Sequence, residues 1–197
     1  GILRAIPETP AFINGVRSML SAGPDKKMSI GLLLEKQARR HPAGPALKFG
    51  DQVWSYASFN GWVNRIAALY QSMGVADGDV VAIMSENRPE MLACTAAAAK
   101  LGAIAGMINY NQRDEVLTHS LGLIKPKVMV VGDESVAAVE ATEYSPLRNQ
   151  TLRHLWLGAD PEQCPLGYVD LETETHMLPS VNPDSTKNVL SQQPCFY

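Results

Sequence analysis

Between residues 80 and 131, short apolar runs alternate with stretches that favour helix. The apolar runs cover 80–84, 103–108 and 128–131. The alanine-rich stretch 91–101 favours a helix because alanine is the best helix former, with Pro89 suited to its first turn and Gly102 to its end. A second helix is predicted over 114–124, where the apolar residues form one stripe. Apolar strands alternating with helices predict an α/β fold whose predominantly parallel sheet is flanked by helices.

Three further elements are predicted before residue 80. Ser29 suits the N-cap of a helix that runs to about His41. The buried face of this helix is predicted to be Ile30, Leu33, Leu34 and Ala38. Two short apolar stretches, 46–49 and 52–56, flank a glycine-containing turn and predict a β-hairpin. Apolar residues then recur at steps of three and four over 59–73, which predicts a third helix.

After residue 131 the pattern weakens. Val136 and Val139 predict a short helix, and residues 152–157 predict one more strand. From Gly158 onward prolines dominate and no period is visible, which predicts an irregular connecting arm. The strong periodicity is therefore confined to the middle of the chain.

The first 28 residues are predicted to be peripheral to the fold. Their apolar positions fall at helical spacing and are Phe12, Ile13, Val16, Met19 and Leu20. One interpretation is a helix that lies on a membrane surface, and the other is a helix packed on its own domain or on a partner. The segment carries little positive charge, which favours the second interpretation. The predicted division is a peripheral segment (1–28), an α/β subdomain (29–158) and an irregular arm (159–197).

Composition and charge narrow the class of protein. Hydrophobic residues make up 46% of the 197 residues, as in globular proteins, and the net charge of −3 argues against nucleic acid as a partner. Cys94, Cys164 and Cys195 are odd in number and far apart, which disfavours a disulfide framework and a zinc site and makes a reducing cytoplasm the default. The apolar window 91–108 contains Lys100 and is divided by a glycine, so a helix followed by a strand is predicted rather than a membrane span.

Motifs that would assign a chemistry directly are absent from the sequence. It contains neither the G-x-G-x-x-G nor the Walker pattern of phosphate loops, it lacks G-x-S-x-G, and its histidines show no metal-ligand spacing. Lys100 lies near the end of a predicted helix and is interpreted as a partner of the helix dipole rather than a reactive amine. Cys94 is interpreted as a small buried hydrophobe, and His119 as a residue at a helix boundary.

The polar residues that follow two of the predicted strands are more informative. In open parallel sheets, ligands bind beyond the carboxyl ends of the strands. That rule points to 85–88 and to 109–113. The alternative is that both are ordinary strand-to-helix loops with capping asparagines. The sequence favours neither reading over the other.

Four stretches, in this order and spacing, resemble one known family. They are QARRHPAGPALKFGDQVWSYASF (37–59), NRIAALYQSMGVADGDVVAIMSENRPEML (64–92), AKLGAIAGMINYNQRDEVLTHSL (99–121) and KPKVMVV (125–131). Together they resemble the beginning of an adenylate-forming enzyme, in the fatty-acid transport protein/very-long-chain acyl-CoA synthetase branch. The run 108–111, followed by Arg113 and 119–121, is what favours that branch over other adenylate-forming relatives. The resemblance implies the N-terminal subdomain of the acyl-CoA synthetase fold.

The resemblance also implies a function for the full-length protein. That protein would be an ATP-dependent fatty acid–CoA ligase that uses magnesium, forms an acyl-adenylate and transfers the acyl group to CoA. It would lie in the cytoplasm, with a peripheral contact to a membrane. Tyr110, Asn111 and Arg113 are the residues expected to face substrate, because they follow a strand end. No catalytic residue and no metal ligand is assigned within the chain.

The family's phosphate loop has the pattern Tyr-Thr-Ser-Gly-Thr-Thr-Gly and follows a strand that resembles 194–197. The 197-residue piece is therefore predicted to be inactive alone, to bind ATP, CoA and magnesium weakly, and to self-associate through surfaces left uncovered. A different class remains open, a free-standing binding or interaction module that kept the fold and lost catalysis. A third option, an unrelated doubly wound nucleotide-binding domain, is disfavoured because its glycine fingerprint is absent.

Overall fold

The computed structural model describes residue 23 and residues 25–197. Five parallel strands form one sheet in the order β4-β3-β5-β6-β7. They are β3 (Val80–Met84), β4 (Ile104–Met107), β5 (Val128–Gly132), β6 (Arg153–Leu157) and β7 (Val169–Asp170). The prediction of a predominantly parallel sheet is confirmed. The apolar positions predicted to form a helix over 12–20 lie outside the described residues.

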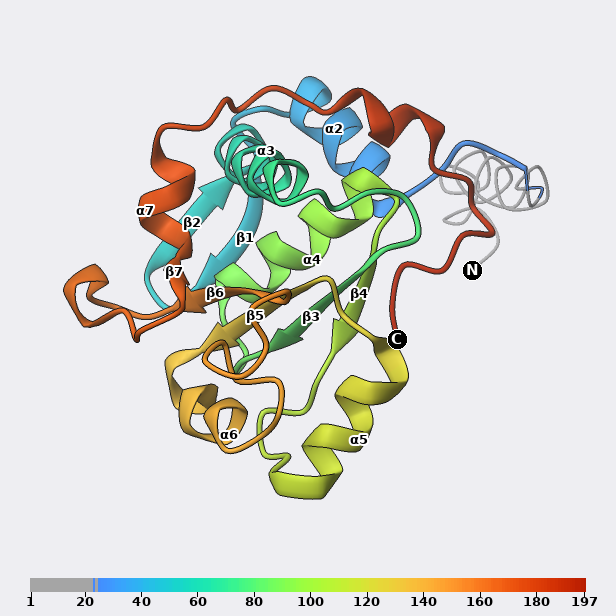
Figure 1. Cartoon of the computed structure of the whole chain (residues 1–197). Coiled ribbons are helices and arrows are strands. Elements are labelled where there is room, and N and C mark those ends of the chain that lie inside the picture. Colours follow the sequence, from blue (N-terminus) through green and yellow to red (C-terminus); the bar gives the residue numbers. More distant parts are fainter. Residues whose placement is uncertain (1–22, 24) are drawn as a thin grey trace, which may run out of the picture.

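Helices cover both faces of the sheet (Figure 1). The helices on one face are α2 (Ile30–Arg40), α3 (Tyr56–Ser72), α4 (Pro89–Leu101) and α7 (Leu171–His176). The other face carries α5 (Asp114–Ile124) and α6 (Val136–Glu140), preceded by the 3-10 turn η2 (Asp133–Ser135). Each face has its own core cluster of buried apolar side chains. This layering is what the alternation of strands and helices predicts.

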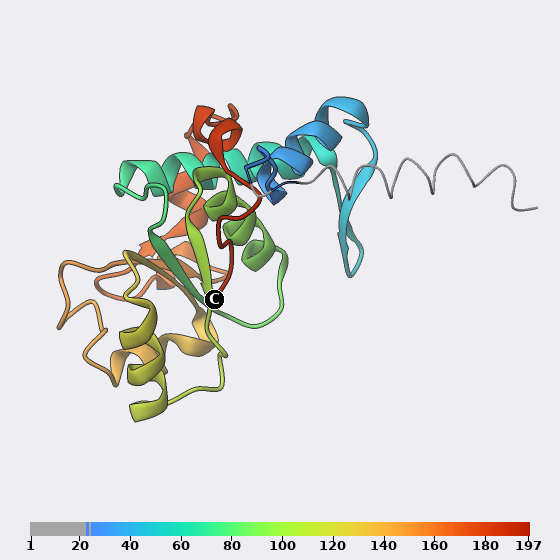
Figure 2. The same cartoon turned by 90° about the vertical axis from the view of Figure 1, so that its right-hand side faces the viewer.

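A two-stranded antiparallel hairpin stands apart from the sheet (Figure 2). Its strands are β1 (Pro45–Phe49) and β2 (Gln52–Ser55). Ser55 also caps α3, because its Oγ accepts a hydrogen bond from the Ser58 amide at 3.1 Å. The predicted hairpin and the helix after it are therefore both present, joined by a single capping residue.

The caps predicted for α2 and α4 also form. Ser29 Oγ accepts a hydrogen bond from the Leu32 amide, and Pro89 stands in the first turn of α4. Gly102 ends α4 in the left-handed conformation, with φ 74°. This backbone conformation favours glycine because it lacks a Cβ. A side chain there would also overlap the Asp77 carboxylate.

The predicted buried face of α2 is wrong in part. Ile30 and Leu33 are exposed, whereas Gly31 and Glu35 are the buried positions of the helix. The physical reason is electrostatic. The Glu35 carboxylate pairs with the buried ammonium of Lys100, so the side of α2 that carries Glu35 faces inward. An apolar pattern alone does not predict a buried carboxylate.

Residues 159–197 contain more regular structure than their sequence pattern predicts. The 3-10 turn η3 (Pro161–Gln163) precedes β7, and Asp170 then caps α7 by accepting a hydrogen bond from the Thr173 amide. From Leu178 to the last residue the chain forms an extended segment, here called the C-terminal arm, with one 3-10 turn, η4 (Asp184–Asn188). The arm crosses α3 and α2 and ends beside β4 (Figure 1).

The end of the arm extends the sheet at its β4 edge. The amides of Ala105 and Met107 donate to the carbonyls of Cys195 and Tyr197, at 3.0 and 3.1 Å, and the Tyr197 amide donates to the Ala105 carbonyl at 3.1 Å. The pairing is parallel. The last three residues therefore run toward the carboxyl edge of the sheet, the same edge at which β4 ends.

Candidate functional site at the carboxyl edge of the sheet

The strand order defines where a ligand site is expected. In chain order the sheet reads 2-1-3-4-5, with β3 as its first strand and β4 as its second. Sheets of this order bind ligands at the carboxyl ends of strands 1 and 3, where the direction of winding reverses. In this molecule those strands are β3 and β5.

Arg88 dominates this switch point. Its guanidinium lies 3.4 Å from a carboxylate oxygen of Glu90 and 3.9 Å from one of Glu134, and it donates a 2.8 Å hydrogen bond to the Leu157 carbonyl. Glu134 also accepts a 2.6 Å hydrogen bond from the Glu86 amide. One arginine therefore ties together the loops that follow β3, β5 and β6. Glu134 was not singled out from the sequence, because nothing in its neighbourhood distinguishes it from a solvated surface acid.

A polar hollow of about 330 Å³ lies beside Arg88. It is lined by residues at the ends of β6 and β7, among them Trp156, Gly158 and Asp170. A Cβ at Gly158 would overlap the Trp156 ring, so a glycine is needed where the chain turns over the indole. The Trp156 Nε1–H donates to the Asp133 carboxylate at 3.3 Å, which fixes the ring as a wall of the hollow.

The turn after β4 carries the three residues expected to face substrate. Tyr110 is half-buried and packs against the core cluster of the α5 face, whereas Asn111 and Arg113 are exposed. Arg113 Nη1 donates to the carbonyls of Tyr110 and Gln112, at 2.6 and 2.7 Å. A guanidinium has five N–H donors, so most of its hydrogen-bonding capacity is not used by this turn. The three residues do lie together at the carboxyl edge.

Asn109 gives the turn its shape. Its side-chain oxygen accepts a 2.9 Å hydrogen bond from the Asn111 amide, as in an Asx turn, and its carbonyl accepts one from the Gln112 amide. Asn109 therefore has a structural role in the loop, as in the alternative in which 109–113 is an ordinary strand-to-helix connection. The turn leaves the Asn111 side chain exposed.

Lys100 lies in the last turn of α4, as expected, but its side chain makes contacts that the sequence did not indicate. Its side chain is completely buried, and its ammonium contacts the Glu35 carboxylate at 3.2 Å and the amide oxygens of three asparagines at 2.6 to 3.0 Å. Burial lowers the pKa of Lys100 to about 8, because the charged ammonium loses its water, although the Glu35 carboxylate acts in the opposite direction. Cys94 is buried as predicted, and burial raises the pKa of its thiol to about 12.

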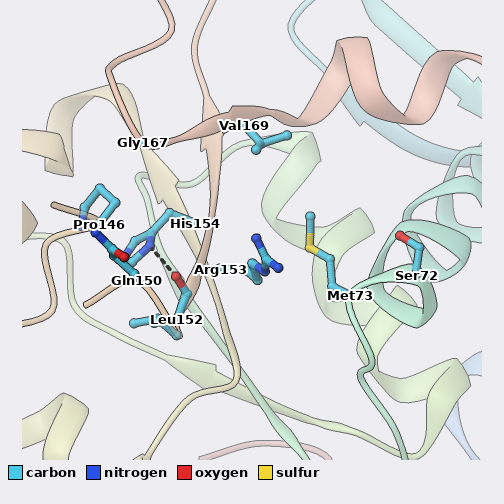
Figure 3. Close-up of a pocket in the computed structure, with 9 residues that line it drawn as sticks. All are labelled: Ser72, Met73, Pro146, Gln150, Leu152, Arg153, His154, Gly167 and Val169. Carbon is cyan, nitrogen blue, oxygen red and sulfur yellow. Dashed lines mark hydrogen bonds between the residues drawn. The ribbon is translucent and has the colours of Figure 1, made fainter. Parts of the chain in front are cut away.

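A second hollow, of about 370 Å³, lies at the opposite, amino edge of the sheet (Figure 3). His154 forms one of its walls, with its ring nitrogens 3.0 and 2.7 Å from the carbonyl oxygens of Leu152 and Tyr144. Burial lowers the pKa of His154, while these two carbonyls act against that shift. The number of N–H groups on the imidazole decides whether one or both of these carbonyls receive a hydrogen bond. The ring packs edge-on against Tyr168 and serves the core.

Neither edge offers a metal site within the described residues, where no group of three His, Cys, Asp or Glu side chains converges. The carboxylates at the switch point are also held by Arg88, which competes with a cation. The described residues therefore form no set of protein ligands that would hold a Mg²⁺ ion by themselves. Among the same residues, no helix is long and apolar enough to cross a membrane.

Comparisons with known proteins identify the family of this chain. A family model described as AMP-binding enzyme matches residues 34–188. The chain belongs to the AMP-binding enzyme family. In that family it is similar to the medium/long-chain-fatty-acid–CoA ligase of Mycobacterium tuberculosis, with 37% identity over 194 residues, covering 98% of this chain and 30% of that protein. It is also similar to long-chain fatty acid transport protein 1 of Mus musculus, with 35% identity over 113 residues, covering 56% of this chain and 18% of that protein.

Solved structures of fatty acyl-CoA synthetases share the fold of this AMP-binding enzyme chain. A fatty acyl-CoA synthetase of Mycobacterium tuberculosis superposes with a TM-score of 0.69 and 28% identity, over 82% of this chain and 30% of that one. The predicted fold, the N-terminal part of an acyl-CoA synthetase, is confirmed. The chain spans 30% of the length of its fatty-acid–CoA ligase relative, so the comparisons describe one part of a longer architecture.

Proposed function

We propose that the chain is the N-terminal part of a long- or very-long-chain fatty acid–CoA ligase. The full-length protein would activate a fatty acid with ATP through an acyl-adenylate and transfer the acyl group to CoA. The observation that carries the proposal is the parallel pairing of Cys195–Tyr197 with β4. In the family that this chain resembles, the phosphate loop follows a strand in this place. The direction of the arm would deliver that loop to the carboxyl edge, next to the turn at 109–113.

Within this proposal, the turn after β4 forms one wall of the substrate cleft. Arg113 would attract an anionic substrate group, because it keeps free donor capacity at an exposed position. Tyr110 would hold the wall in place through its packing, and Asn111 would offer an amide. ATP, CoA and Mg²⁺ would be held mainly by residues beyond this chain. The division of the chain at 28 and 158 remains a proposal.

The test is an ATP-dependent acyl-CoA synthesis assay on the full-length gene product and on the 197-residue chain, across a series of fatty-acid lengths. We expect thioester only from the full-length product, with Mg²⁺ present, and none from the shorter chain. Activity of the shorter chain would overturn the claim that the chemistry lies beyond it. Activity of neither protein would overturn the ligase proposal and favour a non-catalytic binding module.

The 197-residue chain is also proposed to self-associate. Phe49, Val53, Met107 and Phe196 are exposed apolar side chains on the hairpin and the β4 edge. Exposed apolar surface and an open sheet edge both favour association. Light scattering over a wide concentration range should give a mass above that of a monomer, and a monomer throughout would contradict this proposal. In cells the full-length protein is proposed to be cytoplasmic, with a peripheral contact to a membrane.

A further inference from the structure

The buried ammonium of Lys100 is the meeting point of four separate parts of the chain. Its contacts are Glu35 from α2 (3.2 Å), Asn60 and Asn64 from α3 (2.7 and 2.6 Å) and Asn182 from the C-terminal arm (3.0 Å). An ammonium has three N–H donors, so four oxygens at these distances satisfy it completely. A buried charge is tolerated only when it is paired and hydrogen-bonded in this way.

The C-terminal arm differs from the other segments of this cluster, because its contact residue, Asn182, lies in neither a helix nor a strand. Asn182 Oδ1 also accepts hydrogen bonds from the side-chain amides of Asn60 and Asn64, at 2.9 and 2.8 Å. Asn64 donates in addition to the Ser180 carbonyl at 2.9 Å, and Ser185 Oγ donates to the Lys100 carbonyl at 3.0 Å. One stretch of the arm, 180–185, is therefore fastened to both α3 and α4.

The rest of the arm depends on weaker contacts. Beyond Val189, which is buried, the side-chain contacts to other segments are exposed, such as that of Gln193 with Asp77 at 2.9 Å. The arm then ends with the backbone pairing of Cys195–Tyr197 to β4. Exposed hydrogen bonds contribute little, because water competes for both partners. Among the described residues, the partly buried contact of Asn182 with the Lys100 ammonium is thus the one contact to a charged group that fastens the stretch 180–185 of the arm.

We propose that Lys100 is a positioning residue that, through Asn182, holds the C-terminal arm where its last residues pair with β4. The importance of that placement rests on the proposed function, because the arm would lead to the phosphate loop. The placement itself does not require the ligase activity. It therefore has a readout of its own, the exchange of the amides that bond to the arm.

The experiment is hydrogen–deuterium exchange, followed by NMR, on the 197-residue chain. Asn182→Leu removes the oxygen at nearly constant size, and Asn182→Asp keeps an oxygen acceptor. Lys187→Ala is the matched control, because Lys187 lies on the same arm but pairs with Asp184 at the exposed surface. The reporters are the amides of Ala105 and Met107, with the amides of β3 as an internal reference.

We expect Asn182→Leu to speed exchange at both reporters by at least about tenfold, the effect of losing a hydrogen bond to a charged group, with β3 unchanged. Asn182→Asp and Lys187→Ala should stay within about threefold of wild type. The proposal would be overturned if Asn182→Leu left the exchange of both reporters unchanged. It would also be overturned if Asn182→Asp raised that exchange as much as Asn182→Leu does. An equal rise in β3 would overturn it as well, because the effect would then be global unfolding.

Two further measurements make the test decisive. If Asn182→Leu does not fold, Ser185→Ala removes a separate arm contact and should raise exchange at the same reporters without affecting β3. In the full-length protein, Asn182→Leu should raise the KM for ATP by about tenfold and leave the KM for fatty acid unchanged, since only the arm is displaced. Absence of ligase activity in the wild-type full-length protein would refute the proposed function, while the exchange result would still decide whether the contact between Lys100 and Asn182 holds the arm.

Discussion

Lys100 and Arg88 are both cations that join segments distant in sequence, but their surroundings differ. The Lys100 side chain is fully buried and contacts one carboxylate and three amide oxygens. The Arg88 side chain is 28% exposed, and its guanidinium contacts two carboxylates and one carbonyl. The first cation lies between helices on one face of the sheet, and the second lies at the carboxyl edge, where the candidate site is. Because Lys100 is buried, its contacts stabilise the fold. Because Arg88 is partly exposed, it can exchange its partners.

The largest expected effect comes from removing the buried cation. Lys100→Met should lower the free energy of unfolding by about 3–5 kcal/mol, because Glu35 is left as an uncompensated buried charge. Urea denaturation measures this. The double variant Glu35→Leu/Lys100→Met should recover at least about 1 kcal/mol, since it removes both charges. A double variant no more stable than the single one would show that the charge pair is not what Lys100 contributes.

The pH dependence of stability sharpens the comparison further. Lys100 has a pKa of about 8 in the folded state and an ordinary value of 10.5. Below pH 8 both states carry the proton, and between pH 8 and 10.5 the unfolded state binds more protons than the folded one. Stability from this group therefore rises with pH across that window, by up to about 3 kcal/mol.

Other ionisable groups also contribute to the dependence of stability on pH, so the relevant quantity is the difference in slope between wild type and Lys100→Met. Replacing Arg88 should leave that difference unchanged. A wild-type slope equal to that of Lys100→Met would contradict a lowered pKa for the buried lysine.

Packing around Lys100 gives the third prediction. A Cβ at Gly31 would lie 2.7 Å from the Lys100 Cγ and 3.1 Å from a Thr186 methyl carbon. The lysine chain cannot move aside because its ammonium is held by four oxygens, so Gly31→Ala should destabilise by about 1–3 kcal/mol in thermal or urea unfolding. Gly61→Ala is the matched control.

At Gly61, in the interior of α3, the nearest atom to a new Cβ is at 3.6 Å, an ordinary contact. That substitution should stabilise by about 0.5–1 kcal/mol, because alanine favours helix. The same change in two helices should thus have opposite signs. Destabilisation by both would show that the space around Lys100 is not the cause.

The sequence predicted the sheet well where apolar runs are long and failed where polar groups decide the packing. Residues 80–84 and 128–131 are fully apolar, and both are buried strands. The two-residue β7 and the six-residue, polar α7 are too short to produce a visible period. Leu171 shows the consequence, since it is a core residue within a segment that had no predicted structure.

The candidate site was predictable in position but not in its contacts. The rule for parallel sheets located both 85–88 and 109–113, and the structure places both at the carboxyl edge. The sequence also contained an indication that Lys100 is buried, because Lys100 continues the helical spacing of the buried residues Ala93, Ala96 and Ala97 along α4. Its partners could not be read from sequence, because Glu35 is 65 residues away and Asn182 is 82 away.

The smallest expected effect is at the switch point. Arg88→Met removes two partly exposed ion pairs and one hydrogen bond to the Leu157 carbonyl, and should lower the free energy of unfolding by about 1–2 kcal/mol. Raising the salt concentration to about 1 M should weaken the contribution of Arg88, because partly exposed charges are screened, and should leave that of Lys100 nearly unchanged.

The contributions of Lys100 and Arg88 to the free energy of unfolding can thus be distinguished by urea denaturation of wild type, Arg88→Met and Lys100→Met at low and high salt. Equal salt sensitivity of both variants would mean that water and ions reach Lys100 as readily as Arg88. A salt effect confined to Arg88 would agree with the difference in burial. It would also agree with a guanidinium at the sheet edge that can release Glu134 or Glu90 and accept an anionic ligand in their place.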